Sequence, residues 1–307
     1  MKRILLTTAL SAGLIACGDG NPFDTNNVNN NAADPNTNAN KRFLFDTGRF
    51  LTANQFTYDA TADTIQINNL PFDGVSASGG AYTRQAAVVL PNGAQVYQNS
   101  PGTGEDTYVA VIVRNGTTGT LAGAVGTNAY RGFGYGGAYA ERPSSGLPAT
   151  RPAAYSYTGN YAGVRVIRQD VTGAADALQL TTGTAGITVD LQNLDNGGSI
   201  KGRVTGRQLW DTNGNLIGAM DTILLNETTI DTTNNRTNDN ATADTLNADG
   251  TQAQVGTWEG NFSGPNGEEI VGYVVIEGQI SDRDPSHDAT NTVEGREIGG
   301  FITQVTP

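Results

Sequence analysis

Residues 199–210 read Ser-Ile-Lys-Gly-Arg-Val-Thr-Gly-Arg-Gln-Leu-Trp, and apolar residues and glycines alternate with polar residues along this stretch. In a strand, one face would carry Ile200, Gly202, Val204, Gly206 and Trp210, and the other would carry Ser199, Lys201, Arg203, Thr205 and Arg207. Such a period of two residues indicates a β-strand. Glycine alternating with a bulky residue is typical of the packed interior of a small closed barrel.

The same alternation recurs twice further along the chain. Trp258, Gly260, Phe262 and Gly264 alternate with Thr257, Glu259, Asn261 and Ser263, and Ile270, Gly272, Val274, Ile276 and Gly278 continue the pattern. In a transmembrane barrel these apolar faces would point outward to lipid, but glycine suits lipid poorly and no aromatic girdles flank the strands. We therefore predict an all-β chain whose residues 151–307 form a soluble antiparallel barrel of about eight strands.

The N-terminal half also predicts strands, and no stretch has convincing helical periodicity. Residues 64–67 alternate, and the runs 86–90 and 108–113 are apolar and β-branched, bounded by the turn signals Pro91-Asn-Gly93 and Asn115-Gly116. The segment 141–152 holds three prolines, so we place a domain boundary there. Residues 42–150 are predicted to form a separate, smaller β domain.

Cys17, the single cysteine, comes directly after a segment that has the features of a secretory signal. Lys2 and Arg3 precede the apolar run 4–16, which is too short to cross a bilayer. The run ends in Leu14-Ile-Ala-Cys17, which resembles a bacterial lipobox. This resemblance implies a signal peptide over 1–16, cleavage before Cys17, and acylation of its thiol and new amino group. Gly18, rather than Asp, follows Cys17, which by resemblance to sorted lipoproteins favours the outer membrane.

Residues 17–41 are predicted to form a flexible, asparagine-rich tether, because they hold too little apolar surface to offset their conformational entropy. Without Lys2 and Arg3, the mature chain has 16 basic and 30 acidic residues, a net charge of −14. So acidic a chain is a poor match for nucleic acid, whose binding depends on cations that displace counterions. It also argues against attachment to anionic lipid by charge. With Cys17 acylated, no disulfide can form, so a sizeable core must supply the stability.

Residues 261–273, Asn-Phe-Ser-Gly-Pro-Asn-Gly-Glu-Glu-Ile-Val-Gly-Tyr, resemble a hairpin of the transferrin-binding protein B-like barrel of Gram-negative lipoproteins. Residues 157–163, 187–191 and 200–204 fit the same barrel, and residues 69–74 followed by Tyr82 resemble its preceding β handle domain. The resemblance implies a handle-plus-barrel lipoprotein that binds a protein or an iron-bearing ligand at the outer membrane. A TonB-dependent receptor is a possible partner. One handle and one barrel are present, not a double set, and no family binding residue can be carried over.

Two motifs have the spacing of known sites but a better structural explanation. Gly132-Phe-Gly-Tyr-Gly136-Gly137 has the spacing of a dinucleotide fingerprint, but no helix can follow it because Glu141-Arg-Pro143 comes next. We interpret it as a glycine-aromatic strand or turn. Asp211-Thr-Asn-Gly-Asn215 resembles half of a calcium loop, yet Leu216 stands where an EF-hand needs glycine. We interpret it as a hairpin turn.

Catalytic and metal-binding residues are not predicted. Glu268 and Glu269 would point to opposite faces of a strand, which prevents them from acting as an acid–base pair. The family resemblance makes both structural. His287, the single histidine, could bind zinc or haem iron, but a lone histidine in a polar loop is usually only exposed. Haem ligation by one of the tyrosines stays open. No Gly-x-Ser-x-Gly motif and no free cysteine is present for nucleophilic catalysis.

Residues 234–250 form a long polar segment between two expected strands, read equally well as a disordered loop or as a recognition loop. We expect a non-catalytic outer-membrane lipoprotein without a cofactor. It would bind a ligand linked to iron or haem acquisition, or a macromolecule at the cell surface. The alternative is a structural envelope lipoprotein without a soluble ligand.

Overall fold

The computed structural model describes residues 35–74, 81–130, 132–149, 154–169, 177–192 and 197–306. Cys17, the signal segment and almost all of the predicted tether lie outside these residues. The described chain is all-β apart from two short 3-10 turns, η1 (Pro35–Thr37) and η2 (Thr47–Arg49). None of its helices is long and apolar enough to cross a membrane.

The first half folds into an antiparallel sheet of eight strands, which we call the handle sheet. Its order is β1-β8-β7-β6-β5-β4-β3-β2. The strands are β1 (Lys41–Leu44), β2 (Gln55–Asp59), β3 (Thr64–Asn68), β4 (Tyr82–Arg84), β5 (Gln95–Gln98), β6 (Val109–Asn115), β7 (Thr120–Gly126) and β8 (Gly136–Glu141). The expected strands near residues 64 and 108 are thus confirmed as β3 and β6.

The strand expected over residues 86–90 is wrong. This run is an irregular connection between β4 and β5 that starts with a turn, in which the Val88 amide donates to the Gln85 carbonyl at 3.0 Å. Its apolar residues are explained by contacts with other parts of the fold. Val88 and Leu90 are buried in a core shared with the barrel, whereas Val89 points outward.

The second half forms a closed antiparallel barrel of eight principal strands, as predicted. They are β9 (Ala154–Gln169), β10 (Ala177–Asp190), β11 (Ser199–Asp211), β13 (Ile223–Thr228), β16 (Thr242–Leu246), β17 (Gln252–Ser263), β18 (Glu269–Gln279) and β19 (Val293–Val305). The pairing of β17 with β18 closes the ring. The short strands β12 (Leu216–Ala219), β14 (Ile230–Asp231) and β15 (Arg236–Thr237) extend it. The exact division into domains at residue 150 stays a prediction.

The barrel interior is packed by the side chains that the alternation placed there. Ile200, Val204, Trp258 and Phe262 all lie in one buried apolar cluster. Glycines make room for the large residues opposite them. A Cβ at Gly299 would lie 2.3 Å from the Tyr161 hydroxyl, so the tyrosine ring fills the space that a side chain there would occupy.

The predicted alternation breaks at Gly206, where our assignment of Arg207 and Trp210 is wrong. Gly206 has a φ of +58°, and the register between β10 and β11 shifts there by one residue. The extra residue is a β-bulge, which exchanges the two faces of the strand beyond it. Arg207 therefore points into the barrel, and Trp210 packs outside it against the core shared with the handle sheet.

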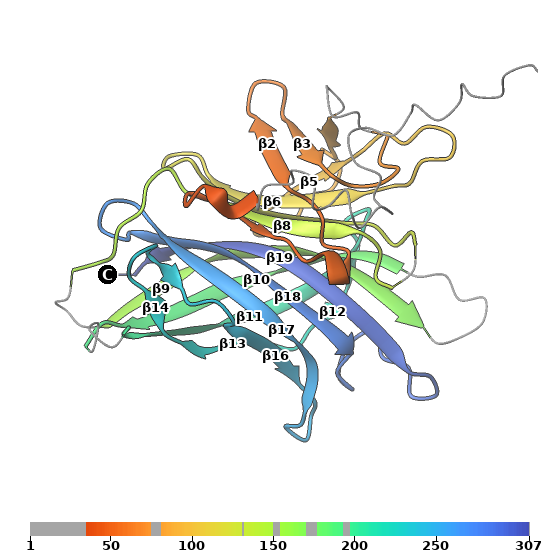
Figure 1. Ribbon diagram of the computed structural model, residues 1–307. Helices are drawn as coiled ribbons and strands as arrows, with labels where there is room; N and C mark the ends of the chain where they lie inside the picture. Colours follow the sequence, from red (N-terminus) through yellow and green to blue (C-terminus); the bar gives the residue numbers. More distant parts are fainter. Residues whose placement is uncertain are drawn as a thin grey trace, which may run out of the picture.

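The handle sheet covers one side of the barrel, over β9, β18 and β19 (Figure 1). Of these strands, β18 and β19 are buried on both faces. Val274 and Phe301 face the barrel interior, whereas Val271, Val275 and Ile298 join handle residues in a second core. The residues between the alternating apolar positions of β18 are thus also apolar because they face the handle sheet. We call this interface between the handle sheet and the barrel the seam.

A set of polar contacts, which we call the seam cluster, fixes the handle sheet on the barrel. Arg42 of β1 donates two hydrogen bonds to the Glu259 carboxylate, at 2.8 and 3.1 Å. The Tyr273 hydroxyl and the Arg236 guanidinium reach the same carboxylate, at 2.9 and 3.4 Å. Glu259 belongs to the outward face predicted for β17, so the strand's polar face meets the handle.

A second set of charges, the inner cluster, lies inside the barrel. It consists of Arg165, Arg207, Asp284 and Glu297, which are nine-tenths or more buried. Arg207 pairs with Glu297, and Arg165 pairs with Asp284 at 2.6 Å. The Glu297 carboxylate also accepts from the Tyr161 hydroxyl at 2.6 Å. Asp284 belongs to the β18–β19 connection, so this loop closes one end of the barrel over the charges.

The segment 234–250 is neither a disordered nor a free recognition loop, which corrects both interpretations. It contains β15 and β16, and β16 is a principal barrel strand between β13 and β17. Ala241, Ala243 and Thr245 are buried, while the Asp244 carboxylate accepts hydrogen bonds from Asn226 and Gln252. The strand was missed because its inward residues are small and its polar residues are satisfied by neighbouring side chains.

Candidate ligand-binding surface

Four aromatic side chains on the handle form a continuous row, which we call the aromatic row. Phe50 lies 5.1 Å from Tyr135, Tyr135 lies 5.4 Å from Tyr130, and Tyr130 lies 5.9 Å from Phe72, between ring centroids. Phe50 and Phe72 at the two ends are 38% and 43% exposed. Between them, Tyr130 is partly buried and Tyr135 is buried. Large exposed aromatic residues such as Phe50 and Phe72 are typical of protein interaction sites.

Three of these four residues have a backbone conformation that disfavours bulky side chains. The φ angles are +59° for Phe50, +54° for Phe72 and +76° for Tyr130. This left-handed region costs a non-glycine residue about 1–2 kcal/mol. Strained positions of this kind are concentrated at ligand-binding sites. The other described non-glycine residues at positive φ are aspartate or asparagine, which tolerate this region (Asp63, Asn69, Asn235 and Asn240), so the bulky residues found there all belong to the row, which favours a functional surface.

Local hydrogen bonds hold these conformations in place. Phe50 caps η2, and its amide donates to the Thr47 carbonyl. The carbonyl of Phe72 accepts from the Asp106 amide at 2.7 Å. The hydroxyls of Tyr108 and Tyr130 both donate to the Pro71 carbonyl, at 2.9 and 3.4 Å.

A barrel residue holds the loops that carry the row. Arg296 of β19 donates to the carbonyls of Arg49, Phe133 and Gly134, which belong to the two loops that carry Phe50 and Tyr135. Burial lowers the pKa of Arg296 to about 10, which leaves it positively charged near neutral pH. The row is therefore built on the docked arrangement of handle and barrel.

The tyrosines of the row are neutral at physiological pH. Burial raises the pKa of Tyr135, and burial together with a hydrogen bond to Asp106 raises that of Tyr130. The row thus offers mainly the exposed rings of Phe50 and Phe72, and it has no charge of its own. Such a surface suits a protein ligand that contributes apolar side chains and hydrogen-bonding groups.

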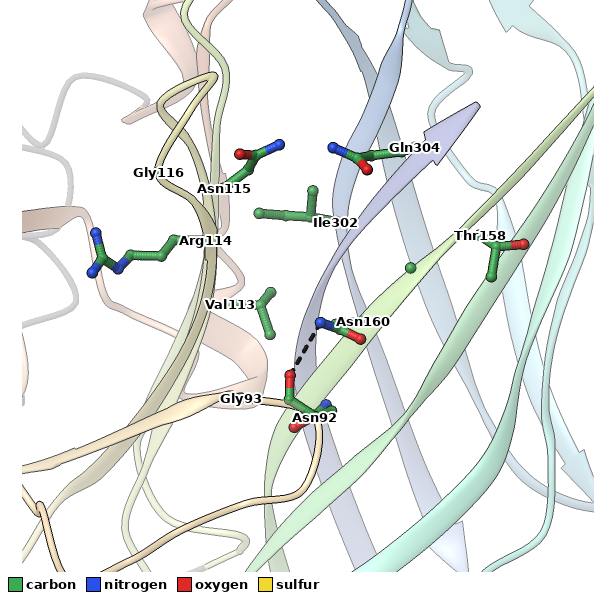
Figure 2. A pocket seen from close by; sticks show the side chains of 11 residues that line it. Asn92, Gly93, Val113, Arg114, Asn115, Gly116, Thr158, Asn160, Ile302 and Gln304 are labelled. Carbon is green, nitrogen blue, oxygen red and sulfur yellow. Dashed lines mark hydrogen bonds between the residues drawn. The ribbon is translucent and has the colours of Figure 1, made fainter. Parts of the chain in front are cut away.

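A cavity of about 280 Å³ lies at the opposite end of the seam, between the β6–β7 hairpin and β9 (Figure 2). Most of its amide groups already make contacts that join the two sheets. Asn160 donates to the Asn92 carbonyl at 3.1 Å, Asn92 donates to the Tyr161 carbonyl at 2.7 Å, and Asn115 donates to Glu269. Arg114 points away from the opening (Figure 2). We therefore interpret this cavity as part of the seam rather than as a ligand site.

The residues singled out in the sequence have mainly structural roles. Glu269 is buried at the seam, where it also accepts from Thr118 and Thr120 of the β6–β7 hairpin, whereas Glu268 bonds Asn266 in its own turn. This confirms that the two carboxylates diverge. Asp211 accepts from the amides of Asn213 and Asn215, as expected for a hairpin turn.

His287 lies in the β18–β19 loop, where its amide donates to the Asp284 carbonyl at 2.9 Å. Within the described ranges, no group of three His, Cys, Asp or Glu residues could hold a metal ion. The lipidation predicted at Cys17 concerns a residue outside those ranges and stays a prediction.

Sequence reasoning missed the aromatic row, although two of its three loops had been singled out. Phe72 lies in the segment 69–74 that resembles a handle domain, and Tyr135 lies in the rejected dinucleotide motif 132–137. That motif is the turn entering β8, as interpreted, with Gly132 and Gly134 at positive φ. Phe50 had no signal of its own, because its partners are distant in the sequence.

No family model and no curated protein matches this chain. Among solved structures, it is similar to a transferrin binding protein B mutant from Haemophilus parasuis Hp5, with 16% identity over 81% of this chain and 44% of that chain, at a TM-score of 0.36. A surface lipoprotein is similar at 12% identity, 88% and 100% coverage, and a TM-score of 0.38. A transferrin binding protein B mutant from Actinobacillus pleuropneumoniae H49 has 13% identity, 82% and 97% coverage, and a TM-score of 0.35.

The chain spans 44% and 46% of the length of two of the transferrin binding protein B structures that it matches. The handle-plus-barrel fold that the sequence resemblance implied is the fold observed for this chain.

Proposed function

We propose that this chain is a non-catalytic lipoprotein of the outer membrane, anchored through Cys17, which binds a protein ligand at the cell surface through the aromatic row. The observation that carries the proposal is the row itself, with Phe50 and Phe72 exposed and three of its residues at positive φ. Backbone strain and exposed aromatic area both oppose folding or solubility, so a binding role accounts for their retention.

The finer part of the proposal concerns the ligand. Resemblance to transferrin-binding protein B-like lipoproteins supports a protein that carries iron or haem, with a TonB-dependent receptor as the partner that takes up the iron or haem. The neutral row suits a protein surface better than a small anion, because it offers aromatic faces without a cation.

Surface plasmon resonance of the immobilised full chain would test the ligand class. The probes are iron-loaded transferrin, iron-free transferrin and haem-loaded albumin. We expect one of them to bind, and we expect Phe50→Ala and Phe72→Ala each to weaken binding by at least about tenfold, as for aromatic hot spots. Val305→Ala is a matched control, because Val305 is 38% exposed, like Phe50, but lies at the C-terminal end of β19.

Two results would contradict the proposal. Unchanged binding in both phenylalanine variants would exclude the aromatic row, and failure of every probe to bind would exclude an iron- or haem-carrying protein of these kinds. Protease treatment of intact cells tests the location separately, since complete protection of the chain would contradict surface display.

A further inference from the structure

Two arginines and two tyrosines meet at one end of the handle sheet. We call this group and its polar partners the arginine–tyrosine cluster, which consists of Tyr58 (β2), Asp63 (the β2–β3 turn), Arg84 (β4), Gln95 and Tyr97 (β5) and Arg114 (β6). Strand β6 starts beside the aromatic row, where the Tyr108 hydroxyl donates to the Pro71 carbonyl, and Arg114 is its last residue but one. The cluster and the row therefore lie at opposite ends of this strand.

Each guanidinium group of the cluster lies over a tyrosine ring. The Arg114 Cζ is 5.0 Å from the centre of the Tyr58 ring, and the Arg84 Cζ is 5.6 Å from the centre of the Tyr97 ring. The two rings pack edge to face with 6.4 Å between their centroids, so the four side chains form one unit. Contact with an aromatic face holds a guanidinium group in place and leaves the N–H groups at its edge for a ligand.

Asp63 orients the two tyrosines and faces both arginines. Its carboxylate accepts from the Tyr97 and Tyr58 hydroxyls at 2.6 and 3.1 Å, and the hydrogen bond from Tyr97 lowers its pKa, so it stays ionised. It lies 3.7 Å from the Arg84 guanidinium, which is long for an ion pair. Asp59, in the same hairpin, accepts from two amides of its own turn. Among the residues of the cluster, two cations thus face one carboxylate.

Arg114 is the residue of the cluster with unused donors. Its Nε donates to the Gln95 amide oxygen at 3.2 Å, whereas Nη1 and Nη2 make no hydrogen bond or ion pair within the described ranges. The side chain is exposed and points away from the seam cavity (Figure 2). The buried Nε of Arg84 also has no hydrogen-bond partner in the part of the chain that the structure describes. A planar pair of N–H donors at a fixed position matches the two oxygens of a carboxylate.

We propose that the arginine–tyrosine cluster binds a side-chain carboxylate from an acidic segment of a partner protein, with Nη1 and Nη2 of Arg114 donating to its two oxygens. Arg84 adds positive charge within the same unit. A phosphate fits less well, because Asp63 repels its second negative charge. The net charge of −12 does not prevent the contact, because exposed charges more than about 8 Å away are largely screened at physiological salt. This site is separate from the aromatic row and does not depend on it.

An NMR titration of the isotope-labelled full chain tests this proposal, because each arginine Nε–H group gives its own signal. The probes are two acetylated hexapeptides that alternate glycine with glutamate or with glutamine. We expect the glutamate peptide to shift the Nε–H signals of Arg114 and Arg84, and the glutamine peptide to leave them unchanged. Arg203 of β11 is the internal reference. It is also exposed and in no ion pair among the described residues, but it lies over none of their aromatic rings.

Variants separate the built site from a general effect of charge. Arg114→Gln should weaken binding of the glutamate peptide by at least about tenfold, as expected for the loss of paired charge-assisted hydrogen bonds. Arg203→Gln removes the same charge elsewhere and should bind normally. Tyr58→Leu should weaken binding by about threefold because it removes the ring under Arg114, whereas Tyr58→Phe keeps the ring and should bind normally. Circular dichroism confirms that each variant is folded.

Three results would overturn the proposal. They are equal binding of the two peptides, equal losses in Arg114→Gln and Arg203→Gln, and unshifted Arg114 signals at millimolar glutamate peptide. A matching peptide with phosphoserine in place of glutamate tests the anion, since tighter binding of the phosphoserine peptide would assign the cluster to phosphate instead of carboxylate.

Discussion

The inner cluster and the seam cluster use the same residue types in different surroundings. Arg207 and Glu297 are 2% and 0% exposed inside the barrel, whereas the Arg42 and Glu259 side chains at the seam keep 15% and 11% of their surface. A buried charge that loses its partner cannot be hydrated, while a charge at the seam can still reach water. The comparison teaches that the loss of one partner should cost more in the inner pair than in the seam pair, which mainly fixes how the handle docks.

Arg207→Met gives the strongest test of this difference. The substitution leaves the Glu297 carboxylate buried with the hydroxyls of Tyr161 and Thr181 as its remaining neutral donors. We expect the free energy of unfolding in urea to fall by about 3–5 kcal/mol. The double variant Arg207→Met, Glu297→Met should recover much of the loss, since it removes both charges. A single-variant loss below about 1 kcal/mol would show that the inner pair is dispensable.

Glu259→Gln tests the seam with a substitution of nearly the same shape. Arg42 loses the carboxylate partner it has among the described residues, Arg236 keeps Asp231 and Asp239, and both guanidinium groups remain partly hydrated. We expect a loss of about 1.5–3 kcal/mol in urea unfolding, less than for Arg207→Met. Glu268→Gln is the control, because Glu268 bonds Asn266 in an exposed turn and should change stability little. If Glu259→Gln costs as much as Arg207→Met, the two clusters do not differ in the way proposed.

The inner cluster should also leave a signature in the acid range. Burial alone would raise the pKa of Glu297, but Arg207, Arg165 and the Tyr161 hydroxyl lower it below its ordinary value. The resulting stabilisation is complete above the unfolded-state pKa of about 4.3, and it is lost as the pH falls through the lower folded-state pKa.

Urea unfolding between pH 6 and pH 2 (chosen to bracket that pKa of roughly 4.3) measures this loss. Glu297→Gln should reduce the slope of stability against pH by at most about 1.4 kcal/mol per pH unit. An unchanged slope in Glu297→Gln would show that other carboxylates control acid unfolding.

Gly206→Ala tests the bulge that turns Arg207 inward. A Cβ at Gly206 would meet no atom within 4 Å, so the cost comes from the φ of +58° alone. We expect a loss of about 1 kcal/mol. Gly186→Ala in the adjacent strand is the control, since Gly186 is not at positive φ and its Cβ would approach no atom closer than 4.0 Å. Equal stabilities for the two variants would mean that the bulge tolerates a side chain.

The elements whose local signal agrees with their packing were predicted correctly, and those shaped by distant contacts were not. The hairpin formed by β17 and β18 follows from its alternation and from Gly264 and Gly267, which adopt positive φ in the turn. β16 was missed because its small inward residues resemble a polar loop in sequence. Residues 86–90 look like a strand, yet their apolar side chains are explained by contacts with the barrel.

The candidate site shows the same limit. The aromatic row combines Phe50, Phe72 and Tyr130 from three loops, and only the folded handle sheet brings them together. The row has no sequence motif, because the residues that meet are separated along the chain by tens of positions.

The sequence by itself determined that this chain is all-β, that its second half closes into a barrel and where several hairpins turn. These features depend on side-chain period and on glycine at turns, which act over a few residues. The tertiary structure alone decided which faces of β18 and β19 are buried, where Arg207 points and which aromatic residues meet. These depend on packing between distant segments, where one bulge at Gly206 reverses what the local pattern predicts.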